Sequence, residues 1–181
     1  QVALPTAAAI EIYHNFTLMH DDIMDNSEVR RGKPTVHRQW DSNTAILSGD
    51  AMLIFAYHML AMGKPELLGY LAGEFNKMAL EVCEGQQIDI DFEDREDVTL
   101  EEYIDMIRLK TAVIFGAAAK MGAMVAGAPQ EDCKALYDMG IELGLAFQIQ
   151  DDYLDTYGTP ELLGKAIGDD LAEAKKTFLT T

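Results

Sequence analysis

Two aspartate clusters, each at the end of a long apolar stretch, limit how this chain can fold. Both have the form Asp-Asp-x-x-Asp: the first motif is Asp21, Asp22 and Asp25, and the second motif is Asp151, Asp152 and Asp155. On a helix, the first and last aspartate of each motif are i, i+4 neighbours, and like charges at that spacing destabilise the helix. One such cluster can be a solvated acidic helix end. Two in similar settings favour a bound cation that removes the repulsion.

The rest of the pattern predicts an all-α fold, because strand signals are scarce. A capping box, Thr99 with Glu102 three residues later, marks one helix start, and Ser42 is a candidate N-cap for another. Gly32 and Pro34 indicate an irregular segment over residues 26–40. We expect helices over residues 6–24, 42–61, 66–91, about 99–126 and 130–157, and an amphipathic piece that begins near Asp169.

The composition narrows the class of protein. The net charge is −17, from 14 basic and 31 acidic residues, which argues against nucleic acid or an anionic membrane surface as partner. Two cysteines make no disulfide framework, so reduced thiols and a cytoplasmic location are expected. No stretch reaches the roughly 18 uninterrupted apolar residues of a membrane span. We therefore expect no transmembrane segment and a single all-α domain.

Basic side chains stand close to the acidic motifs. Arg30 and Arg31 follow the first motif, and paired arginines can bind phosphate bidentately, although a generic basic turn is the alternative. Lys110 stands in an apolar helix, where a lysine is usually a snorkelling surface residue. Lys165 and Lys175 follow the second motif and are equally compatible with surface charge.

Helical spacing adds polar side chains to the two clusters. Gln148 lies one turn before the second motif and shares its face. His14 lies seven residues before Asp21, on nearly the same face. Gln86 and Asp89 pair at i, i+3. Each residue also has a structural or solvated interpretation.

Together these residues suit a substrate with a diphosphate head and an apolar tail. Carboxylates suit Mg²⁺, which uses one or two of them together with substrate phosphates. Mg²⁺ and basic groups would stabilise diphosphate as a leaving group. An apolar helical interior would hold the tail and exclude water from the resulting carbocation.

At this point the chain resembles the trans-prenyltransferases, the head-to-tail polyprenyl diphosphate synthases that include farnesyl and geranylgeranyl diphosphate synthases. The resemblance follows the family's order over nearly the whole chain, and two Asp-Asp-x-x-Asp motifs with Arg-Arg-Gly after the first make it specific. The matching stretches are HDDIMDNSEVRRGKPTVH (20–37), ILSGDAML (46–53), EGQQIDIDF (84–92), MIRLKTAVIFG (106–116), GLAFQIQDDYLD (144–155) and GKAIGDDLAEAKKT (164–177).

The resemblance implies roles for these residues. The first motif would bind two Mg²⁺ ions with the allylic diphosphate, and the second motif a third ion. Arg30, Lys110 and Lys165 would contact the allylic diphosphate, and Arg31 and His14 the diphosphate of isopentenyl diphosphate. The catalytic set it implies is Asp21, Asp22, Asp25, Lys110, Asp151, Asp152 and Lys165. The further site positions it implies are Gln86, Asp89, Thr111, Gln148 and Lys175.

The resemblance also implies a reaction and an assembly. The allylic diphosphate ionises, the isopentenyl double bond attacks, and a proton is lost, with diphosphate as the acceptor. The family fold is an isoprenoid-synthase-type helical bundle around a deep central cavity, usually homodimeric. The family's upstream Gly-Lys-Arg-x-Arg-type motif and its last helices are absent, so we expect residues 1–181 to be a fragment of the catalytic domain.

Two other functions remain open at this point, and so does the product. A terpene cyclase is also all-α with one Asp-Asp-x-x-Asp, and a non-catalytic partner subunit often has damaged motifs. By family analogy, Phe16 and Thr17, with Tyr13, would form the floor of the cavity. One aromatic residue rather than two at positions 16 and 17 implies, by the same analogy, a product of about C20, with C15 as the alternative.

Overall fold

The computed structural model describes residues 2–158 and 176–181. Apart from one short hairpin, every regular element in these residues is helical, so the all-α prediction is confirmed. The chain groups into two compact units, residues 1–72 and 73–181, each described by itself below. The prediction of a single domain stays a prediction.

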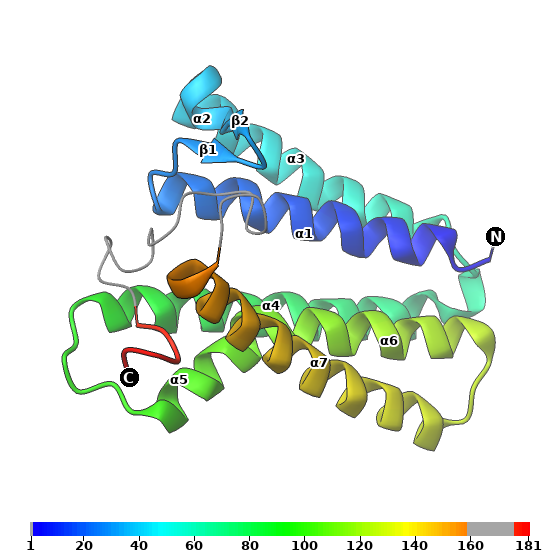
Figure 1. The fold of residues 1–181 in the computed structure, drawn as a ribbon. Coiled ribbons are helices and arrows are strands. Elements are labelled where there is room, and N and C mark those ends of the chain that lie inside the picture. The colour runs from blue at the N-terminus through cyan, green and yellow to red at the C-terminus, as the bar shows by residue number, and fades with distance from the viewer. Residues whose placement is uncertain (1, 159–175) are drawn as a thin grey trace. The chain divides into compact units, whose positions relative to one another are not determined.

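The first unit is built on two long helices, α1 (Leu4–Met24) and α3 (Ser42–Ala61), which lie side by side (Figure 1). Small buried residues, among them Ala9 on α1 and Ala45 on α3, let the two helices approach closely. The unit also contains a short helix, α2 (Val36–Gln39), the 3-10 turn Pro65–Leu67, and the start of α4. Both long helices match the expected ranges to within two residues.

The C-terminus of α1 and the N-terminus of α3 are both capped. Helix α1 ends in a Schellman motif: the Ser27 N–H donates to Asp22 O, and the Asn26 N–H to Ile23 O, with Asn26 at φ 52°. The N-cap of α3 is Asp41, whose Oδ1 accepts from the Thr44 N–H over 2.8 Å. The Ser42 N-cap prediction is therefore wrong by one residue, because the extended Asp41 already satisfies the end of the helix.

Residues 29–34 form an antiparallel hairpin that the sequence did not predict. Strands β1 (Val29–Arg30) and β2 (Lys33–Pro34) pair Arg30 with Lys33. The two turn residues, Arg31 and Gly32, have φ of 52° and 74°, as a two-residue type I′ hairpin turn requires. Arginine is costly in this left-handed region, whereas glycine is not. The hairpin thus fixes the Arg-Arg-Gly sequence in one geometry.

The second unit contains the helices that carry the other half of the predicted residues. They are α4 (Leu68–Glu93), α5 (Leu100–Ile107), the π-helical turn η2 (Arg108–Ala112), α6 (Val113–Ala126) and α7 (Gln130–Tyr157). The predicted helix over 99–126 is thus one helical run interrupted by a π turn. Gly127, in the left-handed region at φ 80°, ends α6 as expected. Helices α6 and α7 lie side by side (Figure 1).

An apolar cluster joins α4, α5 and α7 in the second unit. Its buried members include Phe92, Tyr103, Met106 and Ile107, and Ile149 of α7 packs against them. Tyr103 is 1% exposed. Its hydroxyl therefore needs a partner inside the protein, and the second motif supplies that partner, as described below.

The capping box at the start of α5 is present as predicted. Thr99 Oγ1 accepts from the Glu102 N–H over 3.3 Å, and Glu102 Oε2 accepts from the Thr99 N–H over 2.9 Å. Hydrogen bonds from Arg95 and Thr99 lower the pKa of Glu102 to about 2.

We expect Thr99→Ala to lower the free energy of unfolding by about 1 kcal/mol in urea titration. Ser42→Ala, at a position that is not a cap, should change it by less than about 0.5 kcal/mol. Equal losses would contradict the capping assignment.

Two helical stretches, Ser42–Ala61 and Leu100–Ala126, are long and apolar enough to cross a membrane by length and composition. Core helices of soluble proteins meet the same criteria. Asp50 interrupts the first stretch, and Arg108 and Lys110 interrupt the second, so neither is an uninterrupted apolar span. The expectation of no transmembrane segment stays a prediction.

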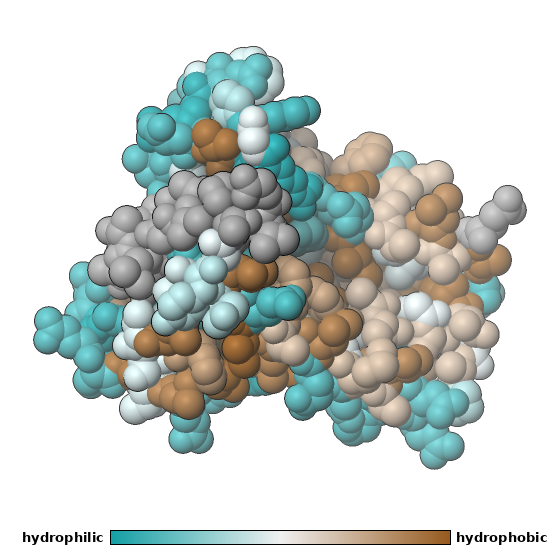
Figure 2. All heavy atoms as spheres, in the orientation of Figure 1, coloured by the Kyte–Doolittle hydropathy of each residue, from teal (hydrophilic) through white to brown (hydrophobic). Residues whose placement is uncertain are grey.

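Exposed apolar side chains follow α7 in a regular row. Leu136, Met139, Leu143 and Phe147 are all at least 36% exposed, and apolar surface is visible along this helix in Figure 2. Their spacing of three and four residues places them on one side of the helix. Polar residues occupy the first turn, so the apolar row begins one turn into α7.

Candidate active site

The first motif occupies the end of α1, where the hairpin brings Arg30 onto it. Arg30 Nε donates to Asp22 Oδ1 over 2.7 Å, and Arg30 Nη2 to Asp21 Oδ2 over 3.4 Å. Asp22 is only 5% exposed. Burial raises the pKa of Asp22, and the hydrogen bond from Arg30 opposes that rise. One guanidinium therefore contacts two neighbouring carboxylates and offsets one of their two negative charges.

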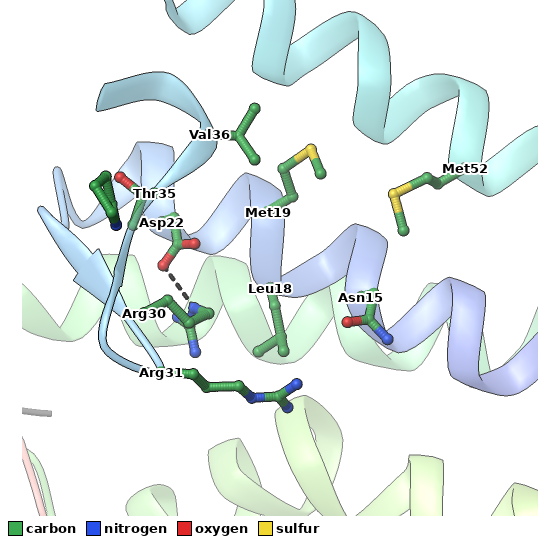
Figure 3. A pocket seen from close by; sticks show the side chains of 10 residues that line it. Asn15, Leu18, Met19, Asp22, Arg30, Arg31, Thr35, Val36 and Met52 are labelled. Carbon is green, nitrogen blue, oxygen red and sulfur yellow. Dashed lines mark hydrogen bonds and ion pairs between the residues drawn. The ribbon is translucent and has the colours of Figure 1, made fainter. Parts of the chain in front are cut away.

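An open pocket of about 300 Å³ lies beside this ion pair, between α1, the hairpin and α3 (Figure 3). The Arg30 side chain points at Asp22, and the Arg31 side chain points away from it. The pocket thus combines a basic edge with an apolar wall, which suits an anion that carries an apolar group. Its lining residues are Asn15, Leu18, Met19, Asp22, Arg30, Arg31, Pro34, Thr35, Val36 and Met52.

His14 belongs to the same electrostatic environment. Burial lowers the pKa of His14 below its ordinary 6.5, and the charges of Arg31 and Arg30 lower it further, while Glu11 opposes the shift. His14 is therefore neutral at physiological pH and offers one N–H donor. The prediction that His14 and Arg31 contact one diphosphate stays a prediction.

The second motif lies in the last turns of α7, where Asp152 is held by three protein groups. Its Oδ2 accepts from the Tyr103 hydroxyl and from the Phe178 N–H over 2.8 Å, and its Oδ1 accepts from Gln148 Nε2 over 3.1 Å. Burial and the bond to Asp152 raise the pKa of Tyr103, so its hydroxyl stays a donor. Neither Tyr103 nor the Phe178 N–H was among the predicted residues, because no sequence spacing links them to the second motif.

Lys110 and Thr111 connect the π turn to two different helices. Lys110 Nζ donates to Asp89 Oδ2 of α4 over 2.6 Å, so this lysine is more than a snorkelling surface residue. Thr111 Oγ1 donates to Gln148 Oε1 over 3.0 Å, and Gln148 passes the chain on to Asp152. The structure therefore brings five of the predicted residues into two sets of contacts, Lys110 with Asp89, and Thr111 with Gln148 and Asp152.

The two motifs use their middle aspartate in the same way. Asp22 and Asp152 are both buried and bound to protein donors, whereas Asp21 and Asp151 are half-buried. Within residues 2–158 and 176–181, no three histidine, cysteine or acidic side chains form a ready metal cage. The donors that both motifs offer are carboxylate oxygens. They fit Mg²⁺, which completes its octahedral shell with water and substrate phosphate.

The remaining predicted residues lie on α4, on α1 or outside the described part of the chain. Gln86 is half-buried on α4, one helical turn before Asp89. Tyr13, Phe16 and Thr17 lie on α1, where Phe16 packs against Tyr13 at 5.6 Å and against His20 at 4.7 Å between ring centroids. Lys165 and Lys175 lie outside the described residues.

Comparisons with known proteins show the family to which the chain belongs. Residues 1–181 match the family model described as polyprenyl synthetase. The geranylfarnesyl diphosphate synthase of Natronomonas pharaonis is 47% identical over 98% of this chain and 52% of its own length. The geranylgeranyl diphosphate synthase of Methanosarcina mazei is 45% identical over 97% of this chain and 55% of its own. A crystal structure of a geranylgeranyl pyrophosphate synthase matches with a TM-score of 0.95 and 54% identity, over 98% of this chain and 54% of that one.

The all-helical fold is that of isoprenoid synthases, and the chain belongs to the polyprenyl synthetase family. The resemblance drawn from the sequence is therefore confirmed. The chain spans about half the length of the curated relatives it matches.

Proposed function

We propose that this chain carries the aspartate-motif part of a prenyltransferase that condenses an allylic diphosphate with isopentenyl diphosphate. The observation that carries the proposal is the matched build of the two motifs. Arg30 anchors the middle aspartate of the first motif, and the Thr111–Gln148 chain ends on the middle aspartate of the second. Relatives with the printed names of geranylgeranyl and geranylfarnesyl diphosphate synthase support the substrate class.

In this proposal the acidic residues bind the metal and the basic residues bind the diphosphate. Bound Mg²⁺, three ions in the complete complex, would neutralise the diphosphate and make it a better leaving group. The carboxylates of both motifs would hold the metal, with protein donors orienting Asp22 and Asp152; the six ligands would be Asp21, Asp22, Asp25, Asp151, Asp152 and Asp155. Arg30, Lys110 and Lys165 would bind the allylic diphosphate.

The second substrate would use the first unit's pocket. Arg31 and neutral His14 would donate to the diphosphate of isopentenyl diphosphate, and Leu18 and Met52 would contact its apolar part. The departing allylic diphosphate would take the proton that is lost after the new carbon–carbon bond forms. Gln86, Asp89 and Lys175 would line the site without a chemical step of their own.

We also propose a homodimer that works in the cytoplasm. Apolar side chains of α3 support the dimer, because Leu47, Ile54 and Phe55 are each more than half exposed. Burying them against a second copy would remove a large apolar surface from water.

Incubation of the full-length protein with Mg²⁺, farnesyl diphosphate and radiolabelled isopentenyl diphosphate tests this function. We expect label in a C20 diphosphate. A hydrocarbon formed from farnesyl diphosphate alone would identify a terpene cyclase. No product without a second subunit, with product restored by one, would identify a partner subunit. The Arg30 contact and the two intact motifs favour the first outcome.

Chain length gives a separate prediction at Phe16. This ring lies about 7 Å along α1 from Asp21 and is held between Tyr13 and His20. Phe16→Ala should open the floor and shift the main product from C20 to C25 or longer, by chromatography of the dephosphorylated alcohols. Phe16→Tyr keeps the ring and should keep the product length. An unchanged product in Phe16→Ala would remove Phe16 from the floor.

A further inference from the structure

Two glycines hold the π turn between neighbouring helices. A Cβ built on Gly85 of α4 would lie 2.2 Å from the backbone nitrogen of Lys110 and 2.7 Å from its Cα. A Cβ built on Gly144 of α7 would lie 2.5 Å from the Cα of Ala112. The obstacles are backbone atoms, so even a methyl group at either glycine forces the turn to move. The π turn is therefore in direct backbone contact with α4 and α7.

The contact at Gly85 also determines where the Lys110 side chain can reach. Asp89 follows Gly85 by four residues, on the same face of α4 and about 6 Å further along the axis. Lys110 Nζ donates to Asp89 Oδ2 over 2.6 Å. The backbone of Lys110 thus rests on one turn of α4, and its ammonium group is held by the next turn.

The π turn sends two consecutive side chains to opposite partners. Lys110 reaches α4, and Thr111 reaches Gln148 of α7. Single π turns within α-helices are frequent at functional sites, and the additional residue in the turn redirects the side chains around it. Here the redirection depends on both neighbouring helices offering glycine at the contact.

We propose that Gly85 is a positioning residue for prenyl transfer, because its lack of a side chain seats the backbone of Lys110 and aims the ammonium group. The role of Lys110 in binding diphosphate rests on the proposed function, whereas the position of Lys110 against Gly85 can be measured without catalysis. With a methyl at position 85, the Lys110 nitrogen must move from 2.2 Å to at least 3.0 Å away. We expect this displacement to weaken the contact between Lys110 and Asp89.

Steady-state kinetics of the full-length protein test the role in catalysis. Gly85→Ala should lower kcat/KM for the allylic diphosphate about 10²-fold, the typical cost of a misplacement near 1 Å. Gly73→Ala is the matched control, because it lies on the same helix and its Cβ would meet nothing within 4 Å; it should stay within about twofold.

A double-mutant cycle separates positioning from general damage. If Gly85 acts through Lys110, adding Gly85→Ala to Lys110→Ala should lower kcat/KM no further. Losses that multiply would overturn the proposal, because they would show that the glycine acts elsewhere.

Chemical labelling measures how firmly Asp89 holds the Lys110 ammonium group. With limiting acetic anhydride and peptide mapping, Lys110 should be acetylated several-fold faster in Gly85→Ala than in the parent, with Lys120 unchanged. Equal labelling of Lys110 would overturn the proposal whatever the activity. If Lys110 is labelled faster in Gly85→Ala but the parent protein transfers no prenyl group, Gly85 still positions Lys110. The proposed function is then rejected.

A second variant covers the case in which Gly85→Ala does not fold. The Ala112 methyl faces Gly144, so Ala112→Gly gives the π turn room to move toward α7. The double variant Gly85→Ala/Ala112→Gly should fold, with kcat/KM still reduced about 10²-fold. Parent-like kcat/KM in the folded double variant would contradict a positioning role.

Discussion

Asp21→Asn and Asp151→Asn are each expected to lower kcat of the full-length protein about 10³-fold, the equivalent of about 4 kcal/mol of transition-state stabilisation. Each change removes a negative charge that would hold Mg²⁺ against the leaving diphosphate. Each keeps the size of the side chain. Neither aspartate is fully buried, so the thermal midpoint should shift little.

Initial rates at saturating substrates, measured over a range of Mg²⁺ concentrations, check this expectation. Asp138→Asn controls for the loss of an acid on α7, where Asp138 forms an exposed pair with Lys134. Glu11→Gln does the same on α1. Both controls should stay within about twofold of the parent. More than a tenth of the parent kcat in Asp21→Asn or Asp151→Asn would contradict a metal-binding role for that residue.

Arg30→Met is expected to cost both stability and activity. It leaves Asp22, 5% exposed, without its charged partner. Removing one member of a buried pair costs about 3–5 kcal/mol, and the partial exposure of Arg30 reduces this to about 2 kcal/mol. The loss of the guanidinium that we propose binds the allylic diphosphate should also lower kcat/KM at least about 10²-fold.

The pH dependence of that loss has a definite sign. Burial already raises the pKa of Asp22, and removing Arg30 raises it further. The folded variant therefore binds a proton that the unfolded chain releases, and its stability falls as pH rises through that window. In urea titrations, the deficit of Arg30→Met should be largest near neutral pH and smaller in acid.

A rescue and a control complete this test. Asp22→Asn in the Arg30→Met background removes the stranded charge and should recover most of the stability, but none of the activity. Arg38→Met breaks an exposed pair with Glu28 in the same segment and should cost less than about 0.5 kcal/mol. A pH-independent deficit in Arg30→Met would argue against Asp22 as its cause.

The helices could be predicted from the sequence because their boundaries are set by local chemistry. The capping box at Thr99 and the break at Gly127 act through hydrogen bonds and backbone angles within a few residues. The acidic motifs were recognisable for the same reason, since their spacing alone places carboxylates on one helical face.

The contacts that organise the site could not be predicted, because they join distant residues. The Tyr103–Asp152 bond spans 49 positions, and the Lys110–Asp89 bond spans 21. Over only five residues, the apolar pattern of a π turn does not differ from that of an α-helix, so the sequence does not reveal the turn. The hairpin has strands of two residues each, too short for an alternating pattern to be recognised.

Anomalous diffraction would show whether both motifs act on one diphosphate, as we propose. Crystals of the full-length protein would be grown with Mn²⁺ in place of Mg²⁺ and with a thiodiphosphate analogue of farnesyl diphosphate. We expect manganese peaks within about 2.5 Å of oxygens of both motifs, all bridged by the one analogue. Manganese peaks at a single motif, or an analogue bound away from both motifs, would contradict a metal–diphosphate site shared by the two motifs.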